Sequence, residues 1–363
     1  MRFLRTGLSA LALMALAAPA IAQVPRTSDG KPDLTGIWTN ASLTPLSRGA
    51  GVKSLVVDEA EARKIANGTS IAGIPADDPE FNRNARYSDP NKGAPEKGGK
   101  DFGLKGYDSF WVTPGTMLGK VKGEYRTSNI VDPPSGQLPF KDPAGQAKKQ
   151  MSGFTRYLTG NAPYEGPEET AISERCLIGF GQTGGPGMLS VLYNNNYQFV
   201  LTPNSMMILV EMAHDVRVVP IFESAAKARA SHKPDAIKPW LGDSVGWWEG
   251  DTLVMETTNV KPLQAENQSF PLSAKAVVTE RLTRTTDKDI FYEFTVNDPD
   301  TYTQPWKAEL SFYPQSRVYE YACHEGNYGM HGILAGARLK EEQAAAAKAK
   351  PVKTSAKASK GGQ

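Results

Sequence analysis

The sequence predicts a mainly β protein in which an antiparallel meander closes into a barrel, with a β-sandwich as the alternative. Two observations support this prediction. Between residues 197 and 323, short segments rich in β-branched and aromatic residues recur with turn residues between them. Several of these segments also alternate apolar and polar residues, which is the period of a strand with one buried face. Barrel closure pairs the edge strands that an open sheet would expose.

Eight or nine consecutive antiparallel strands are expected in this half of the chain. Apolar or aromatic residues occupy positions 290, 292, 294 and 296, and again positions 306, 308, 310 and 312, so each set lines one face of its strand. A helix over 330–343 follows, and Ile333, Leu334 and Leu339 are expected to pack against the barrel. The expected strands cover residues 197–202, 206–213, 216–221, 247–248, 252–258, 275–285, 289–297, 306–313 and 317–323.

Residues 23–170 are expected to form a loop-rich segment that packs on this β domain, because Gly, Pro and polar residues prevail there. One helix is predicted over 58–67, since Asp58 and Glu61 have capping-box spacing and Gly68 follows as a stop. Isolated strands are predicted at 110–113 and 129–131. The β domain with its terminal helix is assigned to residues 171–342.

Both ends of the chain have a distinct composition. Residues 1–22 have the form of a cleavable signal peptide: Arg2 and Arg5 precede an apolar run, and Ala20-Ile21-Ala22 forms a cleavage site. The run is broken by Pro19 and is too short for a membrane anchor, so a soluble periplasmic protein is expected. Residues 343–363 contain five lysines and no acidic residue, which predicts a disordered basic tail.

The content of charged residues, cysteines and histidines limits the partners, metals and cofactors that are expected. Without the two arginines of the signal peptide, 39 basic residues face 39 acidic ones, which argues against nucleic-acid binding. Cys176 and Cys323 are the two cysteines of the chain, and after export they are expected to form a disulfide, with a reactive thiol as the alternative. The four histidines show no zinc spacing, so neither a metal nor a cofactor is predicted.

Two short motifs match sequences of known functional sites, but the residues that follow them do not favour those functions. Residues 179–184 match the spaced glycines of a dinucleotide loop, but Pro186 follows where a helix should begin, so an irregular turn is expected. Ser244 lies in a Gly-x-Ser-x-Gly sequence like that of a nucleophile elbow. Here Trp247 and Trp248 follow instead of a helix, and a serine hydrolase using Ser244 is retained as an alternative function.

The densest group of functional side chains lies in residues 321–328, where the last predicted strand meets the helix. His324 is a candidate acid or base, and Glu325 would orient it. Asn327, which would donate to a substrate oxygen, and Tyr321 are assigned to ligand binding. The structural alternative is a disulfide anchor at Cys323 followed by a helix cap.

A second polar group surrounds a predicted hairpin turn. His214 and Arg217 are assigned to catalysis, and Glu211, Asp215, Glu280 and Trp248 to ligand binding. Glu211 and Glu280 each share a strand face with apolar residues, so each carboxylate is either paired inside the protein or lines a cavity. Arg217 or Arg284 is expected to supply the partner cation.

Several stretches resemble known proteins. Gly36-Ile37-Trp38 is similar to the opening strand of lipocalin-like barrels, in which the tryptophan closes one end of the barrel. The stretches WEGDTLV at 248–254, ERLTR at 280–284, EMAHDVR at 211–217 and EYACHEGNY at 320–328 together resemble a family of uncharacterised exported bacterial proteins. That resemblance implies a shared fold and residence in the periplasm, and it implies no activity.

The sequence therefore predicts a periplasmic β-barrel whose cavity holds a small apolar or aromatic molecule. Whether the protein also transforms that molecule is left open. An enzyme of this kind would be a cofactor-free lyase, isomerase or hydrolase that uses His324 and Glu325, assisted by His214 and Arg217. A non-catalytic structural or interaction protein of the cell envelope is the third possibility, favoured if side chains fill the barrel.

Overall fold

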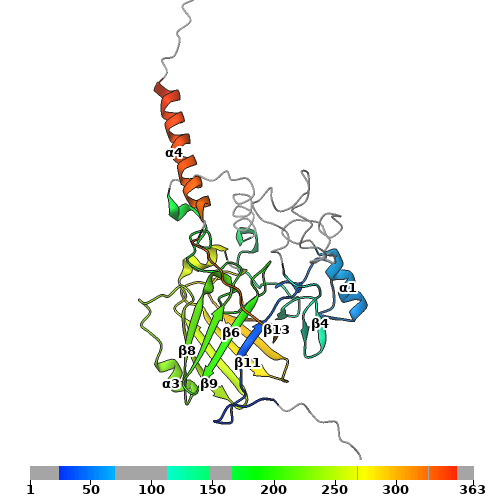
Figure 1. Cartoon of the computed structure of the whole chain (residues 1–363). Coiled ribbons are helices and arrows are strands. Elements are labelled where there is room, and N and C mark those ends of the chain that lie inside the picture. The colour runs from blue at the N-terminus through cyan, green and yellow to red at the C-terminus, as the bar shows by residue number, and fades with distance from the viewer. Residues whose placement is uncertain (1–23, 70–112, 147–165, 268, 326, 350–363) are drawn as a thin grey trace, which may run out of the picture.

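The computed structural model describes residues 24–69, 113–146, 166–267, 269–325 and 327–349 (Figure 1). In these residues ten strands form one sheet, in the order β1-β6-β7-β8-β9-β10-β11-β12-β13-β5. The strands are β1 (Gly36–Thr39), β5 (Ile130–Asp132), β6 (Asn196–Thr202), β7 (Ser205–Val210), β8 (Val216–Phe222), β9 (Asp243–Glu249), β10 (Thr252–Thr258), β11 (Val277–Arg284), β12 (Ile290–Asn297) and β13 (Trp306–Pro314).

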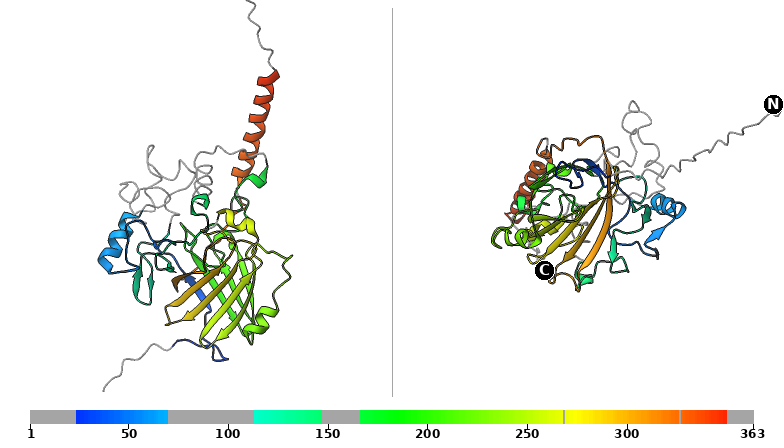
Figure 2. Two further views of the ribbon diagram at one scale, coloured as in Figure 1. Left: turned by 180° about the vertical axis from the view of Figure 1, so that it is seen from behind. Right: turned by 90° about the horizontal axis from the view of Figure 1, so that it is seen from below.

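Pairing of β1 with β13 closes the sheet into a barrel, and the view from below in Figure 2 shows the strands curving around its interior. The predicted mainly β barrel is thus confirmed. A separate small sheet joins β2 (Val56–Val57), β4 (Glu124–Arg126) and β3 (Lys120–Val121). The helices are α1 (Glu59–Gly68), α3 (Ala225–Ala230) and α4 (Tyr328–Ala349), with 3-10 turns η3 (Pro167–Glu169), η4 (Met212–His214) and η5 (Pro262–Asn267).

The sheet is not a simple meander, because β8 and β9 are parallel. Their connection, residues 223–242, carries α3 and returns the chain to the end of the barrel where β8 began. The two strands pair at Ile221 with Gly246 and at Phe222 with Trp247. Upstream of these pairs, toward the first residues of both strands, no described backbone ladder joins β8 to β9.

The alternating faces of β11, β12 and β13 are oriented as the sequence predicts. Val278, Glu280 and Leu282 are buried on β11, and the even-numbered residues 290–296 of β12 and 306–312 of β13 are buried as well. The strand predicted over 206–213 is shorter in the structure: β7 buries Met206, Ile208 and Val210 and ends at Val210 rather than at residue 213. Left-handed backbone at the following turn ends the strand early.

Aromatic rings fill the barrel. Phe312 lies edge-on to Tyr197 and Phe199, with ring centroids 5.1 and 5.3 Å away. Trp306 packs in the same way on Phe294, at 5.6 Å. All five rings are fully buried. The interior of the barrel is therefore a packed core, which meets the condition named above for a structural or interaction role, and space for a ligand has to be sought in the wall and at the ends of the barrel.

The first half of the chain contributes to the barrel as well as covering it. Trp38 of β1 is buried and donates its indole N–H to the Leu34 carbonyl at 3.1 Å, while the Arg284 guanidinium lies over its ring. Trp38 is thus fixed in the wall of the barrel, and its likeness to the lipocalin-like tryptophan stays a prediction. The predicted helix at 58–67 is confirmed as α1, because the Asp58 side chain accepts from the Glu61 N–H.

A strand predicted over 317–323 is wrong. This segment is irregular: the Gln315 N–H donates to the Ile37 carbonyl at 2.8 Å, and the Tyr319 N–H donates to the Glu211 carboxylate at 2.9 Å. Closure of the barrel supplies the reason. The outer edge of β13 already pairs with β1 at residues 313–314 and with β5 at 307–308, so the next segment finds no free edge.

The last helix, α4, projects away from the barrel (Figures 1 and 2). It continues to Ala349, beyond the predicted end at residue 343, because a run of alanines follows and alanine favours helix. Leu339 is 55% exposed, so its predicted packing on the barrel is not formed. The helices of the described ranges all lack the length or apolar character needed to cross a bilayer.

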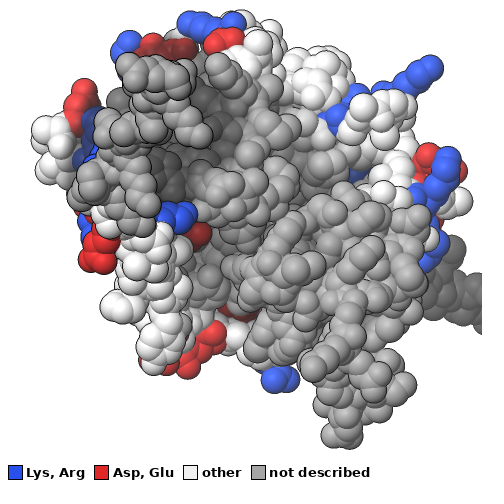
Figure 3. All heavy atoms as spheres, turned by 90° about the horizontal axis from the view of Figure 1, so that it is seen from above, with Lys and Arg blue, Asp and Glu red and all other residues white. Residues whose placement is uncertain are grey.

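The predicted signal peptide, most of the predicted strand at 110–113 and the tail after residue 349 lie outside the described residues. On the described part of the face seen from above, Lys and Arg side chains are interspersed with Asp and Glu (Figure 3). This mixture agrees with the formal net charge of +2 at pH 7.

Candidate functional site

A buried ion pair lies inside the upper half of the barrel. Arg217 on β8 donates from Nη1 to Oε1 of Glu280 on β11 at 3.1 Å, and its Nη2 contacts Oε2 of the same carboxylate. The side chains are 2% and 0% exposed. Burial by itself lowers the pKa of Arg217, but the adjacent Glu280 carboxylate outweighs burial and raises it. The predicted pairing of Glu280 with Arg217 is therefore found.

Further hydrogen bonds complete this network. The Tyr292 hydroxyl donates to Glu280 Oε1 at 2.5 Å, and burial holds the pKa of Tyr292 well above its usual value. On the other side, Arg217 Nη2 donates to the hydroxyls of Ser244 and Thr257, which lie 2.7 Å from each other. The remaining guanidinium nitrogen, Nε, is buried without a hydrogen-bond partner. Both oxygens of the Glu280 carboxylate thus accept hydrogen bonds, whereas one N–H of Arg217 has no acceptor.

A glycine-rich loop plugs the barrel above this network. The Gly187 N–H donates to Glu280 Oε1 at 3.2 Å, and the Met188 N–H donates to the Tyr292 hydroxyl at 2.9 Å. Gly187 has φ of +80°, and a Cβ there would lie 2.9 Å from Phe270. The neighbouring Gly185 has φ of +79°, with the Arg217 guanidinium in the place of its Cβ. Side chains are therefore excluded at both positions, which explains the glycines that resemble a dinucleotide loop.

Replacement of Gly187 by alanine tests this plug. Gly250 is a matched control, since it has φ of +60° and open space where a Cβ would lie. We expect Gly250→Ala to lower the free energy of unfolding by about 1 kcal/mol through backbone strain alone. Gly187→Ala should lower the free energy of unfolding by about 1–3 kcal/mol more than Gly250→Ala, because its Cβ would also overpack the barrel interior. Urea denaturation of both variants measures the difference, and equal losses would show that the loop is not wedged in the barrel.

A cavity of about 280 Å³ lies where β8 and β9 separate. It is bounded by the first residues of the two strands, by the crossover connection and by the segment after Cys176. Its apolar lining residues are Leu177, Ile178, Val216, Val218, Pro239, Trp240 and Leu241, and its charged or hydroxyl-bearing ones are Asp215, Arg217, Lys233, Asp243 and Ser244. We call this space the split cavity, because it lies where the ladder between the parallel strands β8 and β9 is interrupted.

The crossover wall of the split cavity is tied to the barrel by ion pairs. Arg229 of α3 donates from Nε to both carboxylate oxygens of Glu256 at 3.0 Å. His232 Nδ1 lies 2.9 Å from Asp243 Oδ2, and the Lys233 N–H donates to the same oxygen at 2.8 Å. Burial alone would raise the pKa of the Asp243 carboxyl, but the hydrogen bonds from Lys233 and His232 lower it. These contacts hold residues 229–233 of the crossover against β9 and β10.

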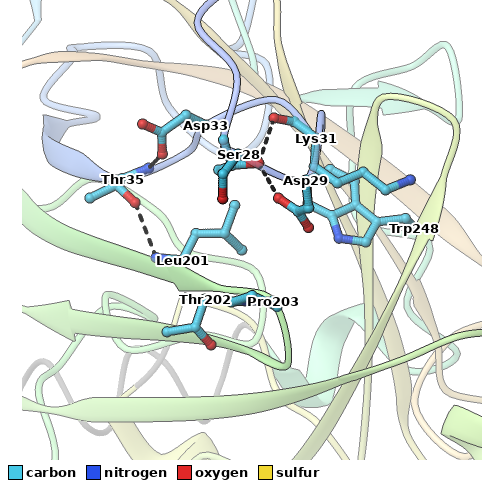
Figure 4. A pocket seen from close by; sticks show the side chains of 10 residues that line it. Ser28, Asp29, Lys31, Asp33, Thr35, Leu201, Thr202, Pro203 and Trp248 are labelled. Carbon is cyan, nitrogen blue, oxygen red and sulfur yellow. Dashed lines mark hydrogen bonds between the residues drawn. The ribbon is translucent and has the colours of Figure 1, made fainter.

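A second cavity, of about 330 Å³, lies at the opposite end of β9 (Figure 4). Trp248 lines it, together with residues of the 27–35 segment and the 201–203 turn. The Lys31 ammonium lies 5.4 Å from the centre of the Trp248 ring, and the Thr35 N–H donates to Asp33 at 2.9 Å. Ligand binding by Trp248 stays a prediction, and the structure separates this residue from the other predicted site residues.

The predicted carboxylate Glu211 lies beside the split cavity but does not line it. It is 3% exposed and accepts hydrogen bonds from the amides of Asn194 and Asn196, both at 2.8 Å, and from the Tyr319 N–H. These three donors are neutral, so the expected arginine partner is not used here. The carboxylate instead joins the turn after β7 to the segment that follows β13.

The predicted acid–base residues lie on the outside of the molecule. His324, Glu325 and Asn327 are exposed and line neither cavity, and the Asn327 amide donates to the Glu174 carbonyl at 3.0 Å. His214 Nδ1 lies 3.0 Å from the Tyr321 carbonyl oxygen. Their catalytic roles stay predictions. The disulfide between Cys176 and Cys323 is confirmed, and it holds this corner next to Leu177 of the split cavity.

Ser244 is the second residue of β9, and β9 continues through the tryptophans that follow. A nucleophile elbow instead places its serine on a sharp turn between a strand and a helix. The Ser244 hydroxyl bonds to Arg217 and Thr257, whereas His232, the histidine nearest to it in sequence, bonds to Asp243. The structure therefore places Ser244 in the ion-pair network and in the wall of the split cavity.

The structure also brings in residues that the sequence did not single out. Trp240 and Leu241 line the split cavity from a loop of the crossover. Gly185 and Gly187 shape the plug, and the spaced glycines were the visible signal for them. No comparable signal marks Trp240, because its place depends on the parallel pairing of β8 and β9.

Comparison of the chain with protein-family models, with curated proteins and with solved structures finds no match.

Proposed function

We propose that this protein is exported to the periplasm and binds a small, largely apolar molecule in the split cavity. The observation that carries the proposal is the cavity itself, in which apolar side chains surround a few polar groups. Export is supported by the form of residues 1–22 and by the disulfide, which is a bond of oxidising compartments.

The exposure of the lining residues supports binding. Val218, Val216 and Leu177 are 63%, 49% and 39% exposed, and all three surround this one opening. Large apolar side chains gathered at a concave site favour a ligand over water, because covering them removes apolar surface from solvent. The packed barrel interior leaves the wall of the barrel as the place for such a ligand.

The geometry supports binding more directly than catalysis. Arg217 and Ser244 are engaged with Glu280 and Thr257, and His324 and Glu325 lie outside the cavity. Binding therefore stands as the proposed function, and transformation of the ligand by acid–base chemistry remains the further prediction drawn from the sequence.

A neutral hydrophobic fluorophore, N-phenyl-1-naphthylamine, tests the proposal. Its fluorescence should rise saturably with the wild-type protein. Val218→Lys places a charge at the opening and should weaken binding by about tenfold, which corresponds to about 1.4 kcal/mol. Val56→Lys is the matched control, since Val56 is also an exposed strand valine, at 36%, and does not line the cavity.

Two results would overturn this proposal. The first is a fluorescence increase that does not saturate with the wild-type protein. The second is equal weakening of binding by the two lysine substitutions, which would place the fluorophore elsewhere or on unfolded protein. In either case a structural or interaction role in the cell envelope would be favoured.

A further inference from the structure

We propose that the ligand of the split cavity is a cation: an apolar or aromatic body that carries a protonated amine, which pairs with Asp215. This inference rests on the proposed function and specifies the chemical class of the molecule. It follows from the charges that line the cavity and from the partners that those charges already have.

The other charged lining residues are neutralised within the protein. Arg217 pairs with Glu280, and Lys233 Nζ lies 3.1 Å from Asp243. Asp215 is different: its carboxylate accepts one hydrogen bond, from the Gly179 N–H at 2.8 Å, and forms no ion pair with any described cation. Among the described residues that line the cavity, Asp215 is therefore the charged side chain without an ion-pair partner.

The fold holds this carboxylate in the cavity wall. Asp215 follows η4, where Ala213 and His214 have φ of +55° and +48°, a rare conformation that sets the direction of the chain into β8. A Cβ on Gly184 would lie 3.2 Å from Asp215 Oδ2, so the glycine at this position gives the carboxylate room. Burial raises the pKa of Asp215 to about 6, and the opposing effects of the Gly179 hydrogen bond and of His214 are smaller than the effect of burial.

An ammonium group is the complement that this site lacks. A charged N–H donor can approach a carboxylate to hydrogen-bond distance and is about twice as strong a partner as a neutral donor. The apolar residues around Asp215, which include Trp240, Leu241 and Ile178, would cover the rest of the molecule. A carboxylate ligand would instead bring a second negative charge beside Asp215.

The pH dependence follows from the state of Asp215. The carboxylate is ionised above pH 6 and neutral below it, while an alkylamine stays protonated throughout this range, so the preference for an amine should fall as the pH drops through about 6. The other charged or titratable groups nearby are His214, Arg217, His232, Lys233, Asp243 and Lys261, the last of which lies 4.1 Å over the Trp240 ring.

Competition with bound N-phenyl-1-naphthylamine tests the inference with three probes of one size: 2-phenylethylamine, 2-phenylethanol and phenylacetate. At pH 7.5 the amine should displace the fluorophore from the wild-type protein at a concentration at least tenfold below that of the alcohol. In Asp215→Asn that ratio should fall below twofold. Asp235→Asn, the same change at an exposed aspartate of the crossover, should keep the wild-type ratio.

A melting curve separates loss of preference from loss of folding. Ionised Asp215 is costly to bury, so Asp215→Asn should melt at a higher temperature than the wild type at pH 7.5. The difference should shrink below pH 6, where the wild-type carboxyl becomes neutral. A variant that melts lower at pH 7.5 would contradict an uncompensated charge.

The outcomes distinguish the two proposals. If the alcohol or phenylacetate displaces the fluorophore as well as the amine does, the split cavity binds ligands and the cationic class is wrong. A preference for the amine that persists in Asp215→Asn also overturns the inference, because the pairing group is then another residue. If the fluorophore itself does not bind, the proposed function fails first.

Discussion

Arg217→Met is expected to lower the free energy of unfolding by about 3–5 kcal/mol, because it leaves the Glu280 carboxylate buried without its cation. The rest of the network cannot compensate, since Tyr292 and the Gly187 N–H are neutral donors that already contact this carboxylate. Urea denaturation at neutral pH, monitored by tryptophan fluorescence, measures the loss.

Two companion variants show whether the loss comes from the unpaired charge. Arg217→Met combined with Glu280→Gln removes both charges and should be more stable than Arg217→Met alone. Arg63→Met breaks the exposed pair with Glu59, whose side chains are 59% and 62% exposed, and should change stability by less than about 0.5 kcal/mol. If Arg217→Met costs no more than Arg63→Met, the buried pair does not stabilise the barrel.

Loss of the disulfide is expected to have the other large effect. Cys176 and Cys323 are separated by 147 residues, so their bond constrains nearly half the chain in the unfolded state. Chain entropy assigns about 5 kcal/mol to a loop of this length, and native bridges typically contribute 2–5 kcal/mol. The double variant Cys176→Ser with Cys323→Ser should lose stability in this range, as measured by urea denaturation.

A reductant supplies the control for this variant. Dithiothreitol should destabilise the wild-type protein by about the same amount and leave the serine variant unchanged. The bond also anchors the segment after β13 beside Leu177, so its removal should weaken fluorophore binding as well. A loss of stability below about 1 kcal/mol would mean that the barrel is held by its strands and core alone.

The ion pair and the split cavity share Arg217 and Ser244, which connects stability to binding. Arg217 reaches from β8 across the interior to Glu280 on β11, and the gap between β8 and β9 leaves the same residue in the cavity wall. The cavity lies at the first residues of the parallel strands, where no described ladder joins them. A meander would have hydrogen-bonded the whole length of β8 to its neighbour and closed the wall.

The sequence by itself determined the mainly β barrel, the inward faces of β11, β12 and β13, helix α1 and the disulfide. These features depend on local patterns: a period of two on a half-buried strand, a capping residue three positions before its partner, and two cysteines in a chain whose first residues predict export. It also indicated that Glu280 needs a partner, because a carboxylate on an apolar face must be satisfied.

Only the tertiary structure decided the parallel pairing of β8 and β9, the end of the last strand at Pro314 and the place of the site. Each depends on which strand edge is free when two segments distant in sequence meet. The local alternation of apolar and polar residues gives no information about this. For the same reason Asp215 and Trp240 become neighbours in one cavity, while His324 and Glu325 lie outside it.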